Sequence, residues 1–259
     1  MITETPTSDP DAVPTAKTLA AVWKLPVRDR TGREIPFGDI VAGPDASTRV
    51  LVFFIRHWFC PVSICIAPRQ GVDENTWRID IDLQACQGYI RKLAAIATPK
   101  VLSSLPIKTT IAIVGSGGPQ LIDHWVKESA CPYPVYTDPS IRLYKTFKFL
   151  PDKGQGESEY HKLTPMQGFL KSASQIVRMA QKLHHGGHPF QNGGELLFEP
   201  VSSSEGAEKQ VTWCHRMQHA TDHAKFVDVL KVLGIEAKML SVLHNISLVS
   251  GGFLSSDSS

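Results

Sequence analysis

The sequence predicts an α/β sandwich, in which a mixed β-sheet lies between layers of helices. Two apolar, β-branched runs, residues 49–56 and 109–114, have the length and composition of buried central strands. An amphipathic helical pattern follows each run, as parallel strands joined by crossover helices require. Near the C-terminal end, strands at residues 195–199 and 210–214 flank the polar segment 202–209, which predicts an antiparallel hairpin.

The helix after the first strand is expected to follow Cys86 and to end before Pro99. Its apolar face comprises Tyr89, Ile90, Leu93, Ala94 and Ala97. After the second strand the chain is expected to turn tightly at residues 115–118, a glycine-rich stretch. Pro119 then suits the first turn of the next helix.

One more short strand and three more helices are predicted along the chain. Residues 134–136 indicate a short strand, and Asp138 or Ser140 is expected to begin the next helix. Residues 166–183 have the period of an amphipathic helix. A last helix is expected from about residue 221 to residue 233.

The length of 259 residues suits one large domain or two small ones. We expect one domain over residues 19–236. Residues 1–18 begin with a stretch rich in Thr, Pro and Asp, which predicts a disordered leader. Residues 237–259 form a tail that mixes apolar residues and Ser without a clear period.

Composition and charge argue against several classes of function. The net charge of +2 lacks the strongly basic footprint of a nucleic-acid-binding protein. No run of about 18 apolar residues predicts a membrane span. The five cysteines are scattered, and the N-terminus has no secretory signal, so a reducing, cytoplasmic compartment is expected.

Residues 54–61, which read Phe-Ile-Arg-His-Trp-Phe-Cys-Pro, resemble the AhpC/TSA-like, peroxiredoxin-like branch of the thioredoxin superfamily. Residues 133–139 with Leu143-Tyr144, residues 193–198 and residues 211–217 resemble the same family, and the likeness spans roughly residues 20–235. It implies a thioredoxin-like three-layer sandwich and thiol-dependent reduction of a small peroxide or disulfide. It also implies thioredoxin or glutathione as the reductant, with no metal or organic cofactor.

The sequence departs from the family pattern at the redox motif. The family places a second cysteine two residues after Cys60-Pro61, whereas here residues 62–84 intervene before Ala85-Cys86. Removing this segment would restore Cys-Pro-Ala-Cys followed directly by the helix. Val62-Ser63 and Gln84 match codons of intron donor and acceptor sites, so we hypothesise a retained intron. The other reading is a genuine insertion loop at the surface.

The resemblance assigns Cys60 as the attacking thiol and Cys86 as the resolving one. A thiol reacts as its thiolate, and a helix N-terminus lowers the cysteine pKa from its usual value of about 8.5. With the insertion present, Cys86 would occupy that helix position in place of Cys60, and we expect weak or no activity. Arg56 and His57 precede Cys60 and are candidates for adding positive charge. Arg56 as a solvated residue at the end of the strand is the alternative.

Several other patterns predict no separate site. Residues 115–118 lack the third glycine of a dinucleotide-binding loop, because Gln120 stands there. Two groups of histidines lack the partners that a zinc site needs, and the second is expected to be surface or capping residues. These groups are His184, His185 and His188, and His215, His219 and His223. Cys131 and Cys214 are expected to be core residues. The main functional alternative is a non-catalytic binding or regulatory protein.

Overall fold

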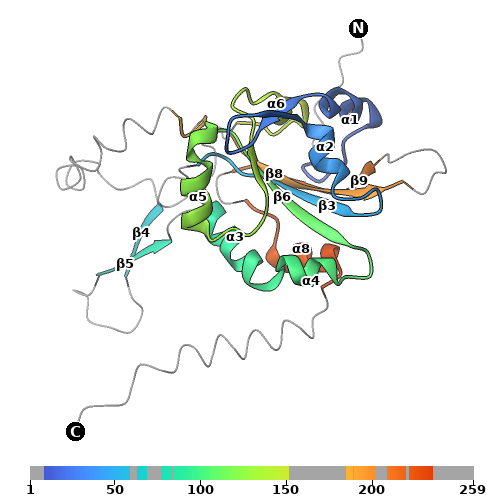
Figure 1. The fold of residues 1–259 in the computed structure, drawn as a ribbon. Helices are drawn as coiled ribbons and strands as arrows, with labels where there is room; N and C mark the ends of the chain where they lie inside the picture. The colour runs from blue at the N-terminus through green and yellow to red at the C-terminus, as the bar shows by residue number, and fades with distance from the viewer. Residues whose placement is uncertain are drawn as a thin grey trace. The chain divides into compact units, whose positions relative to one another are not determined.

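A seven-stranded mixed sheet forms the centre of the fold (Figure 1). The computed structural model describes residues 9–58, 63–68, 77–82, 85–151, 185–188, 190–201, 209–219 and 222–235. In spatial order the strands are β2 (Glu34–Pro36), β1 (Pro26–Arg28), β7 (Val135–Thr137), β6 (Thr109–Gly115), β3 (Arg49–Phe54), β8 (Gly194–Pro200) and β9 (Lys209–Arg216). This arrangement confirms the predicted α/β fold with a central mixed sheet.

The central strand β3 organises the sheet. All of its residues are buried, and it pairs in parallel with β6 and antiparallel with β8. β8 and β9 pair antiparallel, which confirms the predicted hairpin. The first strand was expected to reach Arg56, but β3 ends at Phe54. The Arg56 carbonyl instead accepts a hydrogen bond from Ser116 Oγ at 2.5 Å, so this part of the chain has left the regular ladder.

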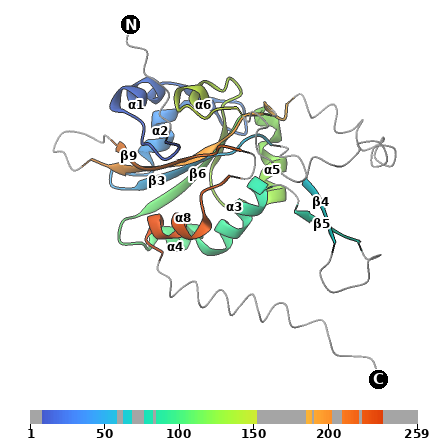
Figure 2. The ribbon, with the colours of Figure 1, turned by 180° about the vertical axis from the view of Figure 1, so that it is seen from behind.

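Helices cover both faces of the sheet (Figures 1 and 2). One face carries α1 (Ala16–Trp23), α2 (Phe37–Ala42) and α6 (Arg142–Thr146), and the other carries α3 (Ala85–Ile96) and α4 (Pro99–Ser103). A short 3₁₀ helix, η1 (Pro119–Leu121), precedes α5 (Ile122–Ser129). The core under α2 is aromatic: Phe37 packs on Phe54, Phe147 and Phe198 with ring centroids 5.8–5.9 Å apart. Such edge and tilted contacts suit the quadrupoles of the rings.

The N-terminal segment differs from the expected disordered leader over residues 1–18. Helix α1 begins at Ala16, and the side chain of Thr15 caps it by accepting a hydrogen bond from the Thr18 amide. Further upstream, the carbonyls of Pro10 and Ala12 accept hydrogen bonds from the Arg216 guanidinium. Contacts distant in sequence therefore hold part of this segment, and composition alone did not indicate them.

The segment that interrupts the redox motif contains two paired strands. β4 (Ser63–Pro68) and β5 (Trp77–Asp82) pair antiparallel, with Ser63 opposite Asp82. A loop was expected here; the backbone instead forms a two-stranded sheet of its own. Several predictions lie outside the described residues: Cys60, the helix at residues 166–183 and the tail at residues 237–259.

The chain divides into two units, residues 1–224 and residues 225–259. Helix α8 (Phe226–Leu233) belongs to the second unit and ends at Gly234, whose φ of +76° suits glycine. The predicted helix began near residue 221. Residues 222–225 are not helical, and the Asp222 carboxylate there accepts a hydrogen bond from the Gln218 amide at 2.8 Å. This local bond holds a turn in the first unit where the periodicity predicted helix.

Candidate functional site

Cys86 is the second residue of α3 and is 1% exposed. The first amides of a helix have no partner within the helix, and they carry partial positive charge. The sulfur therefore lies where a thiolate is favoured electrostatically. Helix α3 begins at Ala85, where the helical periodicity of apolar residues in the sequence begins, as predicted. This placement agrees with the expectation that Cys86 occupies the helix N-terminus in the chain with the insertion.

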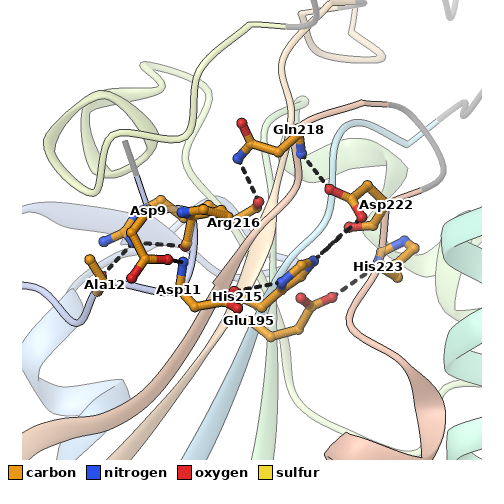
Figure 3. Close-up of polar contacts among 10 residues, drawn as sticks. Asp9, Asp11, Ala12, Glu195, His215, Arg216, Gln218, Asp222 and His223 are labelled. Atoms are coloured by element: carbon orange, nitrogen blue, oxygen red, sulfur yellow. Dashed lines mark hydrogen bonds and ion pairs between the residues drawn. The ribbon is translucent and has the colours of Figure 1, made fainter. Parts of the chain in front are cut away.

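An imidazole lies beside this sulfur. Nε2 of His223 is 3.2 Å from Cys86 Sγ, and Nδ1 of the same ring is 2.8 Å from Glu195 Oε1. The His223 side chain is 6% exposed and the Glu195 side chain is fully buried. The three side chains thus form a chain of contacts from thiol to imidazole to carboxyl. Figure 3 shows its second link, in which Glu195 reaches His223.

A second contact fixes the plane of this imidazole. The Tyr89 ring stacks on the His223 ring, with centroids 4.7 Å apart and an interplanar angle of 22°. The Tyr89 hydroxyl donates a hydrogen bond to the Ala224 carbonyl at 3.0 Å. Tyr89 lies almost one turn after Cys86 on α3, so one helix supplies both the thiol and the ring that packs on its partner.

Glu195 enters the site from β8. The strand begins beside β3 at Gly194, and a Cβ atom at the preceding Gly193 would lie 1.7 Å from the Phe54 carbonyl oxygen. Only glycine allows this close approach of the two backbones. Among the described residues, Glu195 Oε2 and both polar atoms of the Asn192 side chain have no hydrogen-bond partner. The start of β8 therefore combines a close backbone contact with buried polar groups.

Arg56 and His57 follow β3, and both are buried at 3% and 5% exposure. The alternative of a solvated Arg56 is therefore wrong. Burial, together with the positive charge of Arg56 and of His188, lowers the pKa of His57 to about 4. His57 is then neutral near pH 7, so the expectation that it adds positive charge is also wrong. Arg56 remains the cation of this segment.

Trp58 explains two of the glycines in residues 115–118, Gly115 and Gly117. A Cβ atom at Gly117 would lie 2.2 Å from the indole of Trp58, and one at Gly115 would lie 2.6 Å from it. The indole N–H donates to the Gly118 carbonyl at 2.9 Å. Packing of this tryptophan accounts for these two glycines, in agreement with the tight turn that the sequence predicted.

The other cysteines are placed differently. Cys131 and Cys214 are buried, and burial raises the pKa of each thiol to about 11. This confirms that they are core residues. Cys65 lies in β4, and Cys60 lies outside the described residues. Of the predicted site residues, the structure therefore places Cys86 and Arg56 and leaves the position of Cys60 a prediction.

A second polar cluster lies next to the site (Figure 3). His215 on β9 contacts the Asp11 carboxylate through Nδ1 at 2.9 Å and the Asp222 carbonyl through Nε2 at 3.0 Å. Burial alone would lower the pKa of His215, but the hydrogen bond to Asp11 and the negative charge of Glu195 raise it above its usual value. This cluster joins the N-terminal segment to the turn that carries His223.

Sequence reasoning missed His223 and Glu195. His223 was grouped with His215 and His219 by their four-residue spacing and was expected to be a surface or capping residue. Its side chain is instead buried against Cys86, because residues 222–225 are not helical. A buried acidic residue inside an apolar strand, as Glu195 is in β8, was the signal that pointed to a site.

No group of three or more His, Cys, Asp or Glu side chains suited to a metal ion occurs among the described residues. In the same part of the chain, no helix has the length and apolar character to cross a membrane.

Comparison with known proteins finds similarity to AhpC/TSA antioxidant enzymes and to peroxiredoxin-like proteins. The family model of the AhpC/TSA antioxidant enzymes matches residues 99–219, from α4 to just beyond β9. Peroxiredoxin-like 2C of Mus musculus is 26% identical over 221 residues, covering 84% of this chain and 80% of that protein. Peroxiredoxin-like 2C of Homo sapiens is 24% identical over 220 residues with the same coverage. The matched model residues include Glu195 and neither Cys60 nor Cys86.

Among solved structures, peroxiredoxin Q of Xanthomonas campestris is 14% identical, with a TM-score of 0.45 and coverage of 87% of this chain and 96% of that chain. A structure of the bacterioferritin comigratory protein of the same organism is 12% identical. It has a TM-score of 0.45 and covers 86% of this chain and 95% of that chain.

Proposed function

We propose that this chain is a peroxiredoxin-like protein of the thioredoxin superfamily and that it reduces peroxides or disulfides through the thiols of Cys60 and Cys86. One observation carries this proposal: Cys86 lies in the first turn of α3 with its sulfur 3.2 Å from an imidazole nitrogen. Both features favour a thiolate, which is the reactive form. Burial opposes ionisation at Cys86 as it does at Cys131 and Cys214, but neither of those two lies in the first turn of a helix.

The proposed cycle begins at Cys60. Its thiolate attacks one oxygen of a peroxide ROOH, so that an S–O bond forms while the O–O bond breaks. The leaving group takes a proton and departs as ROH, and Cys60 becomes a sulfenic acid. The Cys86 thiolate then attacks the Cys60 sulfur, the S–O bond breaks, and the hydroxide takes a proton and leaves as water. The product is a disulfide between Cys60 and Cys86.

A thiol reductant must then restore the two thiols. We propose thioredoxin, or two molecules of glutathione, which reduce the disulfide by thiol–disulfide exchange without a metal or organic cofactor. The five scattered cysteines suit a reducing compartment, and the cytoplasm is the compartment we propose.

We propose that Arg56 supplies positive charge at the end of β3, four residues before Cys60. Its guanidinium is buried, and its charge contributes to lowering the pKa of the neighbouring His57. A charge that acts on a neighbour in this way would also favour a thiolate and a polar peroxide nearby.

One observation favours a second function. Two paired strands, β4 and β5, lie between Cys60 and Cys86 in the sequence, so the cysteines are not joined by the short family motif. A non-catalytic binding or regulatory protein is the function that this interruption favours for the chain as printed.

A peroxide-consumption assay separates the two functions. The full chain is mixed with hydrogen peroxide or a disulfide, with thioredoxin and its reductase or with glutathione, beside the variants Cys60→Ser and Cys86→Ser. Cys131→Ala serves as a control that alters a core cysteine. Because the insertion is present, the proposal expects weak but measurable activity in the parent and the control, and its loss in the Cys60 variant. Equal turnover in all four proteins would contradict the roles of Cys60 and Cys86, and no turnover in the parent would favour the binding function.

A further inference from the structure

The contacts of Cys86 connect three separate parts of the fold. Cys86 comes from the start of α3, His223 from the non-helical residues before α8, and Glu195 from β8 (Figure 3 shows the last two). The sulfur and the imidazole are 137 residues apart in the sequence, and the imidazole and the carboxyl are 28 apart. Local sequence does not bring these groups together; the tertiary fold does.

The two distances define which nitrogen faces which group. Nδ1 of His223 is 2.8 Å from Glu195 Oε1, a good length for an N–H donating to a carboxylate. A neutral imidazole carries one proton, so a proton on Nδ1 leaves Nε2 as an acceptor. Nε2 is the nitrogen 3.2 Å from Cys86 Sγ, which places a base at the thiol.

The burial of Glu195 argues that this contact is functional. A carboxyl group without exposure to water is costly unless it is paired, and here its paired atom faces only the imidazole. Its second oxygen has no hydrogen-bond partner among the described residues. An apolar residue at this position of β8 would fill the space without that cost, so the buried acid calls for a role other than packing.

We propose that His223 is the acid–base group of Cys86 and that Glu195 is a positioning residue that holds the His223 imidazole. This assignment rests on the proposed function of Cys86 as the resolving thiol. In the resolving step Nε2 takes the proton of the Cys86 thiol while its sulfur bonds to the Cys60 sulfur. The S–O bond of the sulfenic acid breaks, and the departing hydroxide takes a proton from the solvent and leaves as water, while the imidazolium keeps the proton of the thiol. During reduction the imidazolium returns its proton to Cys86.

The charged and titratable groups that contact His223 or lie next to its contacts come from four parts of the structure. They are Cys86 and Tyr89 on α3, Glu195 on β8, His215 on β9 and Asp222, the neighbour of His223. His215 is itself tied to Asp222, so its charge state is a second contribution to any pH profile of the site.

The test follows the two chemical steps separately in a single turnover. The reduced full chain is mixed with one equivalent of hydrogen peroxide, and sulfenic acid and disulfide are quantified by quenched-flow mass spectrometry from pH 5 to pH 9. The variants are His223→Asn and Glu195→Gln, with His124→Asn, an exposed histidine on α5, as the matched control. We expect His223→Asn to slow disulfide formation about 100-fold near pH 7, the usual contribution of a general base. Sulfenic acid formation at Cys60 should stay unchanged.

Glu195→Gln should move the pH profile of disulfide formation, because an amide does not hold the imidazolium as a carboxylate does. Disulfide formation in His223→Asn at the parent rate across this pH range would overturn the assignment while leaving the proposed function intact. A parent chain that forms no disulfide would overturn the proposed function instead.

A measurement on the parent chain needs neither turnover nor a variant. Nitrogen-15 NMR of the histidines, with His223 assigned through its backbone, reports which ring nitrogen carries the proton. The assignment expects the proton on Nδ1 in the neutral ring. A proton on Nε2 would overturn it, even if every variant failed to fold.

Discussion

The Asp11 carboxylate accepts a hydrogen bond from Nδ1 of His215 over 2.9 Å, although 204 residues separate the two in the sequence. The other ring nitrogen of His215 contacts the carbonyl of Asp222, which directly precedes His223. One imidazole thus joins the N-terminal segment, the edge strand β9 and the turn that carries the proposed base. Protonation of His215 strengthens the contact with Asp11, because the pair then carries opposite charges.

This contact predicts a pH dependence of stability. The pKa of His215 is raised in the folded chain despite its burial, so its contribution to folding is fully present below the unfolded pKa of about 6.5. It is lost as the pH rises through the raised folded value. The difference in the free energy of unfolding between the parent and Asp11→Asn should therefore be larger at pH 5.5 than at pH 8.5 in urea titrations. An equal difference at both pH values would contradict the prediction.

His57 predicts the opposite dependence. Its folded pKa of about 4 lies below the unfolded value of about 6.5, so the unfolded chain binds more protons between these values. Stability should fall as the pH drops from about 6.5 to about 4, by up to about 3 kcal/mol from this group. In His57→Gln the fall in unfolding free energy over this range should be smaller by about that amount. An unchanged slope would mean that His57 is protonated in the folded chain.

A single methyl group added at Gly193 should lower the free energy of unfolding by a large amount. A Cβ atom there meets the Phe54 carbonyl oxygen and carbon, which are backbone atoms that cannot rotate away. Gly193→Ala should lower the free energy of unfolding by about 3 kcal/mol, at the upper end of overpacking costs. Gly32→Ala is the comparison, because nothing lies within 4 Å of its Cβ and only the φ of +85° opposes the change. Its cost should be about 1 kcal/mol. Similar losses in both variants would argue against the close approach of β3 and β8.

The hypothesis that residues 62–84 are a retained intron can be tested by sequencing the transcripts. If the segment is a retained intron, some transcripts lack the corresponding nucleotides and encode Cys60-Pro61 joined directly to Ala85-Cys86. Sequencing of full-length cDNA should find them, and deletion of the segment should raise the rate of disulfide formation. The hypothesis fails if every transcript carries the segment and its deletion leaves the rate unchanged.

The sheet could be predicted from the sequence because its signals are local. The run at residues 49–54 is apolar at every position, and the period that begins near Cys86 belongs to one helix. The site required contacts that no local pattern encodes. His223 reaches Cys86 only because the turn at Asp222 delays α8, and Glu195 faces the imidazole only in the register of β8. The burial of His57 likewise depends on the packing around it.

Mass spectrometry of the oxidised full chain tests the central claim most directly. The reduced protein is treated with one equivalent of hydrogen peroxide, the remaining thiols are blocked, and the peptides are mapped without reduction. The account predicts one linked pair, Cys60 with Cys86, while Cys131 and Cys214 carry the blocking group once the chain is denatured. Recovery of Cys60 and Cys86 as unmodified, unlinked thiols after peroxide treatment would contradict it.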